Sequence, residues 1–310
     1  MTVTRLWKVL IVALLLSTST LACLLVRAGA NRDIPHALVF PGANSRETYF
    51  SLHHVREAHT ATRGAGVKVG ILDHLFGTRL HPALYAGGQN FLGEDARWKL
   101  EDKDEHGYWL SLTLREIAPQ AEVYALNTSS GHEAERVDAM VRAIDWAIAH
   151  RLDVLTYSNV AFSPSGRARL DPAVDRALAA GIVIVFIHYG HAGNLLPGSL
   201  VPGLEDSREP DVNVLPYDYS VVFVRDYARL QAGGTNGSYR PFLSMSSTAP
   251  VTAGVVAMLR SLRPGLPPAE CREILRQSAY STVFRGGTAP RVLDAAAAVR
   301  RLGTIASLPR

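Results

Sequence analysis

Residues 243–259 read Leu-Ser-Met-Ser-Ser-Thr-Ala-Pro-Val-Thr-Ala-Gly-Val-Val-Ala-Met-Leu. A hydroxyl-rich turn precedes a run of small and apolar residues, and Pro250 stands where the first turn of a helix tolerates a residue without an N–H. The stretch predicts a turn followed by a buried helix. A serine at such a helix start lies near unpaired N–H groups and the positive end of the helix dipole, so Ser246 is a candidate nucleophile. The alternative is that these hydroxyl groups only cap a core helix.

The chain around this stretch alternates between strand and helix patterns. Strands are predicted at residues 67–72, 121–127, 154–158, 182–187 and 221–224, and helices at residues 106–118, 133–150, 171–180, 268–279 and 292–302. Such alternation favours a parallel sheet with helices on both faces. The predicted fold class is therefore α/β, a three-layer α/β/α domain around a mainly parallel central sheet.

Composition excludes some classes of partner. The chain has 310 residues, is 47% hydrophobic and carries a formal charge of +4. Arg5, Lys8 and Arg27 belong to the N-terminal segment, and without them 29 basic residues face 28 acidic ones. This balance gives no reason to expect a nucleic acid or an anionic surface as partner. Of the two cysteines, Cys23 lies in the apolar leader and Cys271 is predicted to be a small core residue.

The first 30 residues have the plan of a secretory signal peptide. A short basic start precedes an apolar run over residues 9–26, and Ala28-Gly29-Ala30 fits a cleavage site. Two alternatives stay open, because residues 9–26 are long enough to anchor the chain in a membrane and Leu21-Ala22-Cys23 resembles part of a lipoprotein acylation site. Each reading predicts export, either secreted or periplasmic or tethered to the membrane.

Domain boundaries follow from turn signals and composition. Residues 31–54 form a turn-rich segment that leads into the domain, which spans residues 55–302, and residues 303–310 form a tail. The adjacent His53 and His54 lack the spacing of a helical zinc pair, so we expect them on the solvated surface.

Two more candidate residues stand at element ends. Asp73 directly follows a β-rich run, and a carboxylate at the carboxyl end of a buried parallel strand is a common place for chemistry. His106 opens a helix and can be oriented there, although a structural role is the alternative. The charged run before it, residues 94–105, predicts a solvated loop and is an unspecific signal for calcium.

In their order and their flanking motifs, Asp73, His106 and Ser246 resemble the triad of the subtilisin-like serine peptidases (subtilases). The resemblance covers about residues 55–302. In that family a hydrophobic strand ends in Asp before a His-Pro pair, here His81-Pro82, and His-Gly opens a helix that ends in Ala-Pro-x-Ala, as at residues 118–121. The serine motif Gly-Thr-Ser-Met-Ala-Ser/Thr-Pro-x-Val-Ala-Gly aligns on Pro250 and places Ser246 at the nucleophile.

The resemblance implies a subtilisin-like fold and a peptide or protein substrate. Ser246 would attack the peptide carbonyl, His106 would transfer the proton, and Asp73 would orient and stabilise the imidazole. Ser158, Asn159 and Val160 correspond to the strand that pairs with an extended substrate. No metal or organic cofactor is needed for this chemistry, and structural calcium remains open.

The sequence departs from the family pattern near the predicted site. His74-Leu75 follows Asp73 where the family has Thr-Gly or Ser-Gly. The family also completes its oxyanion hole with an Asn after a strand. Asn194 takes that role if the preceding residues loop out, whereas a gapless placement puts Gly190 there, and His188 or His191 could donate instead.

The resulting function is an exported serine endopeptidase that uses Asp73, His106 and Ser246. The altered motif surroundings keep a second hypothesis open, a catalytically inactive domain of this type that binds peptides or partner proteins. A third, another serine hydrolase such as an esterase, lacks its expected Gly-x-Ser-x-Gly motif.

Overall fold

The computed structural model of the protein describes residues 52–93, 97, 103–159, 161–187, 202–203, 211–214, 218–223, 238–243, 245–284 and 287–306. The predictions for the leader, for most of the segment that leads into the domain and for residues 307–310 lie outside these residues. So does most of the charged run at residues 94–105.

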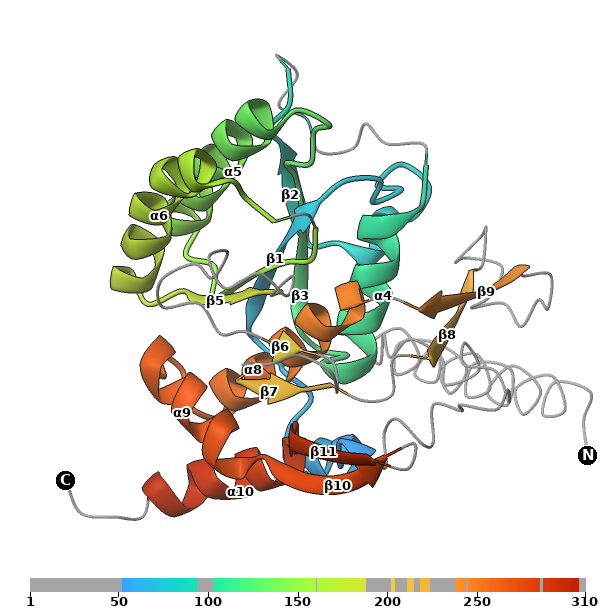
Figure 1. Cartoon of the computed structure of the whole chain (residues 1–310), viewed down its shortest axis with the longest axis vertical. Coiled ribbons are helices and arrows are strands. Elements are labelled where there is room, and N and C mark those ends of the chain that lie inside the picture. Colours follow the sequence, from blue (N-terminus) through green and yellow to red (C-terminus); the bar gives the residue numbers. More distant parts are fainter. Residues whose placement is uncertain are drawn as a thin grey trace, which may run out of the picture. The chain divides into compact units, whose positions relative to one another are not determined.

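The centre of the fold is a sheet of five parallel strands in the order β2-β3-β1-β4-β5 (Figure 1). The strands in chain order are β1 (Lys68–Asp73), β2 (Gly87–Asn90), β3 (Glu122–Asn127), β4 (Val154–Tyr157) and β5 (Val183–Phe186). β1, β4 and β5 are buried almost throughout, as expected for parallel strands covered on both faces. Because the strands run in one direction, their carboxyl ends meet at one edge of the sheet, where β1 ends at Asp73.

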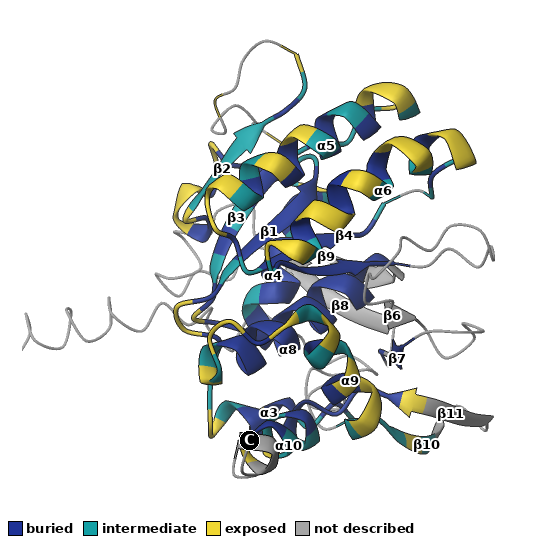
Figure 2. Ribbon diagram, turned by 90° about the vertical axis from the view of Figure 1, so that its left-hand side faces the viewer, coloured by how far each residue is buried: buried dark blue, intermediate teal, exposed yellow. Residues whose placement is uncertain are grey.

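Helices cover both faces of this sheet (Figure 2). On one face, α5 (Glu133–Ala149) and α6 (Pro164–Ala179) pack against each other over a core that includes Leu72, Leu155 and Ile184. On the other, α4 (His106–Ile117) and α8 (Thr248–Leu262) pack against each other and against β1. This confirms the predicted three-layer α/β/α arrangement.

Several shorter elements complete the described fold. They are the helices α3 (Val55–His59), α9 (Pro268–Ser278) and α10 (Ala295–Ala306), and the short 3₁₀ turns η2 (Pro82–Leu84) and η3 (Met245–Ser247). β10 (Tyr280–Phe284) and β11 (Gly287–Val292) form a hairpin in a second sheet with β7 (Val212–Asn213) and β6 (Pro202–Gly203). Among the helices in the described ranges, none combines the length and apolarity needed to cross a membrane.

Three predicted elements exist but differ from the prediction in their bounds or in their pairing. The helix expected at residues 171–180 begins at Pro164, because Ser163 caps it by accepting from the N–H of Gly166. The strand expected at residues 221–224 lies in β8 (Asp218–Phe223), which pairs antiparallel with β9 (Ser238–Leu243) and not with the central sheet. The last helix starts at Ala295, since the residues before it form β11.

His53 also contradicts its prediction of a solvated surface. Its side chain is buried, and Nδ1 lies 2.8 Å from the carbonyl oxygen of Leu293. The neighbouring His54 remains 37% exposed and pairs with Asp294 at 2.9 Å. The C-terminal part of the chain thus contacts both histidines, and it leaves only His54 partly exposed.

Candidate active site

Asp73 and His106 meet at the carboxyl edge of the central sheet. Asp73 is the last residue of β1 and has no exposed surface, and His106 is the first residue of α4. Nδ1 of His106 lies 2.9 Å from Oδ1 of Asp73, within hydrogen-bond distance. In this geometry the carboxylate holds the imidazole by Nδ1, so Nε2 is the nitrogen left to exchange a proton elsewhere.

A glycine allows α4 to begin so close to β1. The N–H of Gly107 donates to the carbonyl oxygen of His74 at 2.8 Å. A Cβ at position 107 would lie 2.5 Å from that oxygen and 2.7 Å from the ring of Phe76. The His-Gly pair therefore places the imidazole directly beside the strand that carries the carboxylate.

Ser246 lies in η3, immediately before α8. Its side chain is 4% exposed, and its hydroxyl donates to the carbonyl oxygen of Ser158 at 3.0 Å. Ser158 directly follows β4, the neighbour of β1 in the sheet, and η3 packs against α4. Strand order thus brings Ser246 to the same edge as Asp73 and His106.

The charge of Asp73 depends on its histidine neighbours. Complete burial by itself raises the pKa of a carboxyl group, because the charged form loses its hydration. Contacts with His106 and His74 outweigh that effect and hold the pKa of Asp73 below its ordinary value. Within the described part of the chain, Oδ2 is buried without a hydrogen-bond partner, so the stabilising contacts converge on Oδ1.

The predicted substrate-binding residues are only partly described. Asn159 follows Ser158 after β4, and its Nδ2 donates to Oγ of Ser129 at 3.2 Å. Ser129 in turn follows β3, and its N–H donates to the carbonyl oxygen of Asp73 at 3.4 Å. Val160 and the oxyanion candidates Asn194, Gly190, His188 and His191 lie outside the described residues, so their roles stay predictions.

Sequence reasoning missed two histidine contacts near this site. Nδ1 of His74 lies 2.9 Å from Oδ1 of Asp73, which makes His74 a second imidazole on that carboxylate. His81 is buried, its Nε2 lies 2.9 Å from Oδ2 of Asp104, and its ring stacks on Tyr108. The departure at position 74 was visible in the sequence, whereas nothing in the sequence signals the pairing of His81 with Asp104.

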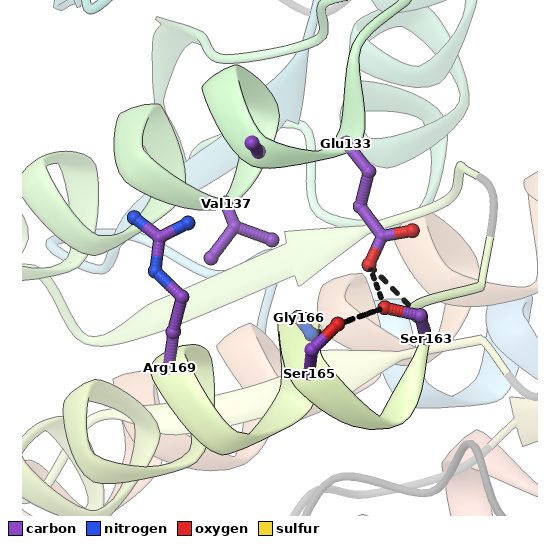
Figure 3. A pocket seen from close by; sticks show the side chains of 7 residues that line it. Glu133, Val137, Ser163, Ser165, Gly166 and Arg169 are labelled. Atoms are coloured by element: carbon purple, nitrogen blue, oxygen red, sulfur yellow. Dashed lines mark hydrogen bonds between the residues drawn. The ribbon is translucent and has the colours of Figure 1, made fainter.

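A cavity of about 300 Å³ lies between the starts of α5 and α6 (Figure 3). Its lining includes Glu133, whose carboxylate accepts from the N–H of Ser163 at 3.0 Å and from the hydroxyl of the same residue. The hydroxyl hydrogen bond lowers the pKa of Glu133. Across the cavity, Arg169 pairs with Asp138. These contacts cap α6 and join the two helices, so we assign Glu133 a structural role.

Neither metal-binding nor thiol chemistry is indicated by the described side chains. Within those residues, no group of three or more His, Cys, Asp or Glu side chains converges as a metal site would require. Cys271 is fully buried as predicted, and burial raises the pKa of its thiol to about 11. Such a thiol is inert.

The sequence is similar to characterised bacterial proteases. It is 25% identical over 236 residues to the thermostable alkaline protease of Halalkalibacterium halodurans, a match that covers 70% of this chain and 63% of that protein. It is 26% identical over 239 residues to subtilisin Savinase of Lederbergia lenta, covering 70% and 85% respectively. The chain thus spans less than two thirds of the length of the first of these relatives. No family model matches the sequence.

Solved structures share the fold. MycP1 with its N-terminal propeptide removed superposes with a TM-score of 0.63 at 17% identity, over 81% of this chain and 96% of that one. A cold-adapted subtilisin-like serine proteinase superposes with a TM-score of 0.57 at 19% identity, over 76% and 90%. At these identities the structural likeness concerns the fold alone.

Proposed function

This chain is a distant member of the subtilisin-like serine protease (subtilase) family, and we propose that it is an exported serine endopeptidase that uses Asp73, His106 and Ser246. One observation carries the proposal. Oδ1 of the fully buried Asp73 lies 2.9 Å from Nδ1 of His106. This pair is at the edge of the sheet where α8, the helix that follows Ser246, begins. A buried charge is costly unless it is paired, and a buried carboxylate paired with an imidazole is typical of a site that orients a general base.

Each residue has a defined step in this reaction. Oγ of Ser246 attacks the carbonyl carbon of the peptide bond while Nε2 of His106 takes the hydroxyl proton. His106 then gives the proton to the leaving amine, and Asp73 stabilises the imidazolium that forms in between. A water molecule then attacks the carbonyl carbon of the acyl-enzyme while His106 takes its proton. His106 returns that proton to Oγ of Ser246, and the second product leaves. The reaction needs no cofactor.

The surroundings of Ser246 suit an extended peptide. Ser158 and Asn159 follow β4 beside the serine, and with Val160 they would pair with the backbone of the substrate. The oxyanion would be stabilised by N–H groups at the start of α8 together with a donor such as Asn194. The leader supports export, and residues 9–26 would provide the membrane attachment if they are retained.

Fluorophosphonate labelling tests the proposed nucleophile. The purified protein should form one adduct, and mass mapping should place it on Ser246, because only an activated hydroxyl attacks the probe. Labelling should vanish in Ser246→Ala and fall at least about a hundredfold in His106→Ala. Ser247→Ala is the matched control, because this neighbouring serine is equally buried and should be dispensable. An adduct on another residue, or full labelling of Ser246→Ala, would refute the assignment.

One observation favours a second candidate function. The Ser246 hydroxyl is nearly buried and donates a hydrogen bond to the carbonyl oxygen of Ser158. A serine held in this way suits a catalytically inactive domain that binds peptides or partner proteins at the same edge. A folded protein that resists labelling but binds extended peptides would support this candidate over the peptidase.

A further inference from the structure

Asp73 is shared between two imidazoles. The backbone N–H of His74 donates to Oδ1 at 2.8 Å, and ring Nδ1 of the same residue lies 2.9 Å from that oxygen. Nδ1 of His106 lies 2.9 Å from Oδ1 as well. The two rings are nearly parallel, at an interplanar angle of 20° with their centroids 6.0 Å apart.

The position of His74 is fixed by the backbone around it. Its carbonyl oxygen accepts from Gly107 at 2.8 Å, and the carbonyl of Leu75 accepts from the N–H of Glu105 at 2.9 Å. Leu75 takes a positive φ of 56°, a conformation that costs energy for a branched side chain. The turn after β1 is therefore pinned to the start of α4.

Packing alone does not direct the His74 ring toward Asp73. The side chain is 36% exposed, whereas the carboxylate that it contacts is fully buried. A ring with that much access to water could turn outward, and the charge of Asp73 is an attraction that favours the inward orientation.

On the α4 side, the charged residues that precede His106 among the described ones are Glu105 and Lys103, which are exposed, and Asp104, which pairs with His81. Among the described residues, η3, the start of α8 and the segments that follow β3 and β4 contribute hydroxyl and amide groups: Ser246, Ser247, Thr128, Ser129, Ser158 and Asn159. Within the same residues, His74 and His106 are the charged partners that act on Asp73.

We propose, on the basis of the proposed function, that His74 is a positioning residue that shares Asp73 with His106 and, when protonated, opposes protonation of His106. A positive charge about 6 Å away disfavours a second one, and it also takes up part of the carboxylate charge that would otherwise stabilise the His106 imidazolium. His106 then stays neutral, and able to act as a base, to lower pH. His74 thereby extends peptidase activity on the acid side.

The pH dependence of kcat/KM tests this role. In His74→Ser the side chain stays polar but carries no charge, so the acid limb of the profile should move up by about one pH unit. The plateau should stay within about tenfold of wild type, because the backbone N–H still holds Oδ1. An acid limb that coincides with that of wild type overturns the inference. A purely structural role would lower the whole profile without moving the limb.

His150→Ser is the matched control for loss of one imidazole. His150 follows α5, is exposed and stacks on Trp146, so its replacement should leave the acid limb in place. A limb that moves equally in this variant would attribute the shift to overall charge and not to His74.

A titration without turnover separates the inference from the peptidase function. In the Ser246→Ala background, with histidines labelled for NMR, protonation of His106 is followed directly, with and without His74→Ser. The midpoint should rise by about one pH unit when His74 is removed. An unmoved midpoint overturns the role of His74 whether or not the protein cleaves peptides. A shift of the midpoint, combined with failure of the protein with Ser246 intact to react with the fluorophosphonate probe, overturns only the peptidase function.

Discussion

The charge of Asp73 contributes to the stability of the folded protein in a way that depends on pH. The unfolded carboxyl titrates near 3.9, and in the folded protein the pKa of Asp73 lies below its ordinary value because His106 and His74 outweigh the cost of burial. Its contribution to stability is therefore complete above about pH 5 and is lost as the pH falls through the folded pKa.

Asp73→Asn should remove this pH dependence. The difference in free energy of unfolding between wild type and the variant should be at its full value at pH 5 and shrink by pH 3, as measured by urea unfolding. Asp145→Asn serves as control, because Asp145 is half exposed in its pair with Arg176 and should contribute little at either pH. A difference that stays constant between pH 5 and pH 3 would contradict the assigned role of the Asp73 charge.

At the residue scale, the sequence predicted candidate groups that belong to a motif and missed those whose role follows from a contact. Asp73, His106 and Ser246 were predicted from their places at strand ends and helix starts, and the fold brings all three to one edge, while their catalytic roles stay proposals. The orientation of the His74 ring toward Asp73 was not predictable, because it depends on a side-chain rotamer and on the turn that α4 fixes.

At the element scale, the site depends on how closely α8 approaches α4. Gly254 of α8 faces Ile117 at the end of α4, and a Cβ at position 254 would lie 2.7 Å from the Ile117 side chain. That distance is shorter than side chains tolerate, so a larger residue must push the two helices apart. Since α4 begins with His106 and α8 follows Ser246, their spacing sets the spacing of the candidate catalytic groups.

Gly254→Ala should destabilise the protein by about 1–3 kcal/mol through overpacking, measured by urea unfolding. Gly303→Ala is the matched control, because Gly303 lies in α10 and a Cβ there meets nothing within 4 Å. It should stabilise the protein by about 0.5–1 kcal/mol. Equal effects from both substitutions would show that the approach of α8 to α4 is not tight.

Elements with a clear apolar pattern were predictable, and those defined by polar caps or distant partners were not. Parallel strands β1, β3, β4 and β5 lie within one or two residues of their predicted places. The start of α6 was missed because its first turns are polar and only the Ser163 cap marks them. The hairpin of β10 and β11 was missed because its partner β7 comes from far earlier in the chain.

At the scale of the whole molecule, contacts between early and late residues close the domain. His53 reaches Leu293 across 240 positions, the N–H of Ala295 donates to the carbonyl oxygen of His53, and α3 packs against α10. The sequence reading expected His53 in water because a contact between such distant positions has no local signature. Without its hydrogen bond, the buried imidazole of His53 would lower the stability of the folded protein.

His53→Ala should therefore lower the free energy of unfolding by about 2–3 kcal/mol, since it removes a packed ring and leaves a buried carbonyl without its partner. His54→Asn is the matched control, because His54 is 37% exposed and Asn tolerates its positive φ of 49°. It should cost less than about 1 kcal/mol. Thermal or urea unfolding of both variants measures the contrast, and a loss at His54 as large as that at His53 would argue against this closure.

The burial of α8 has a consequence for the timing of synthesis. Every residue from Thr248 to Arg260 is buried, so this helix has no face that water can stabilise and forms only against a completed sheet. Asp73 and His106 leave the ribosome more than a hundred residues before Ser246 does. Under the proposed function, a growing chain thus holds the proposed base, His106, without the proposed nucleophile, and peptidase activity would arise only after α8 has been added and folded.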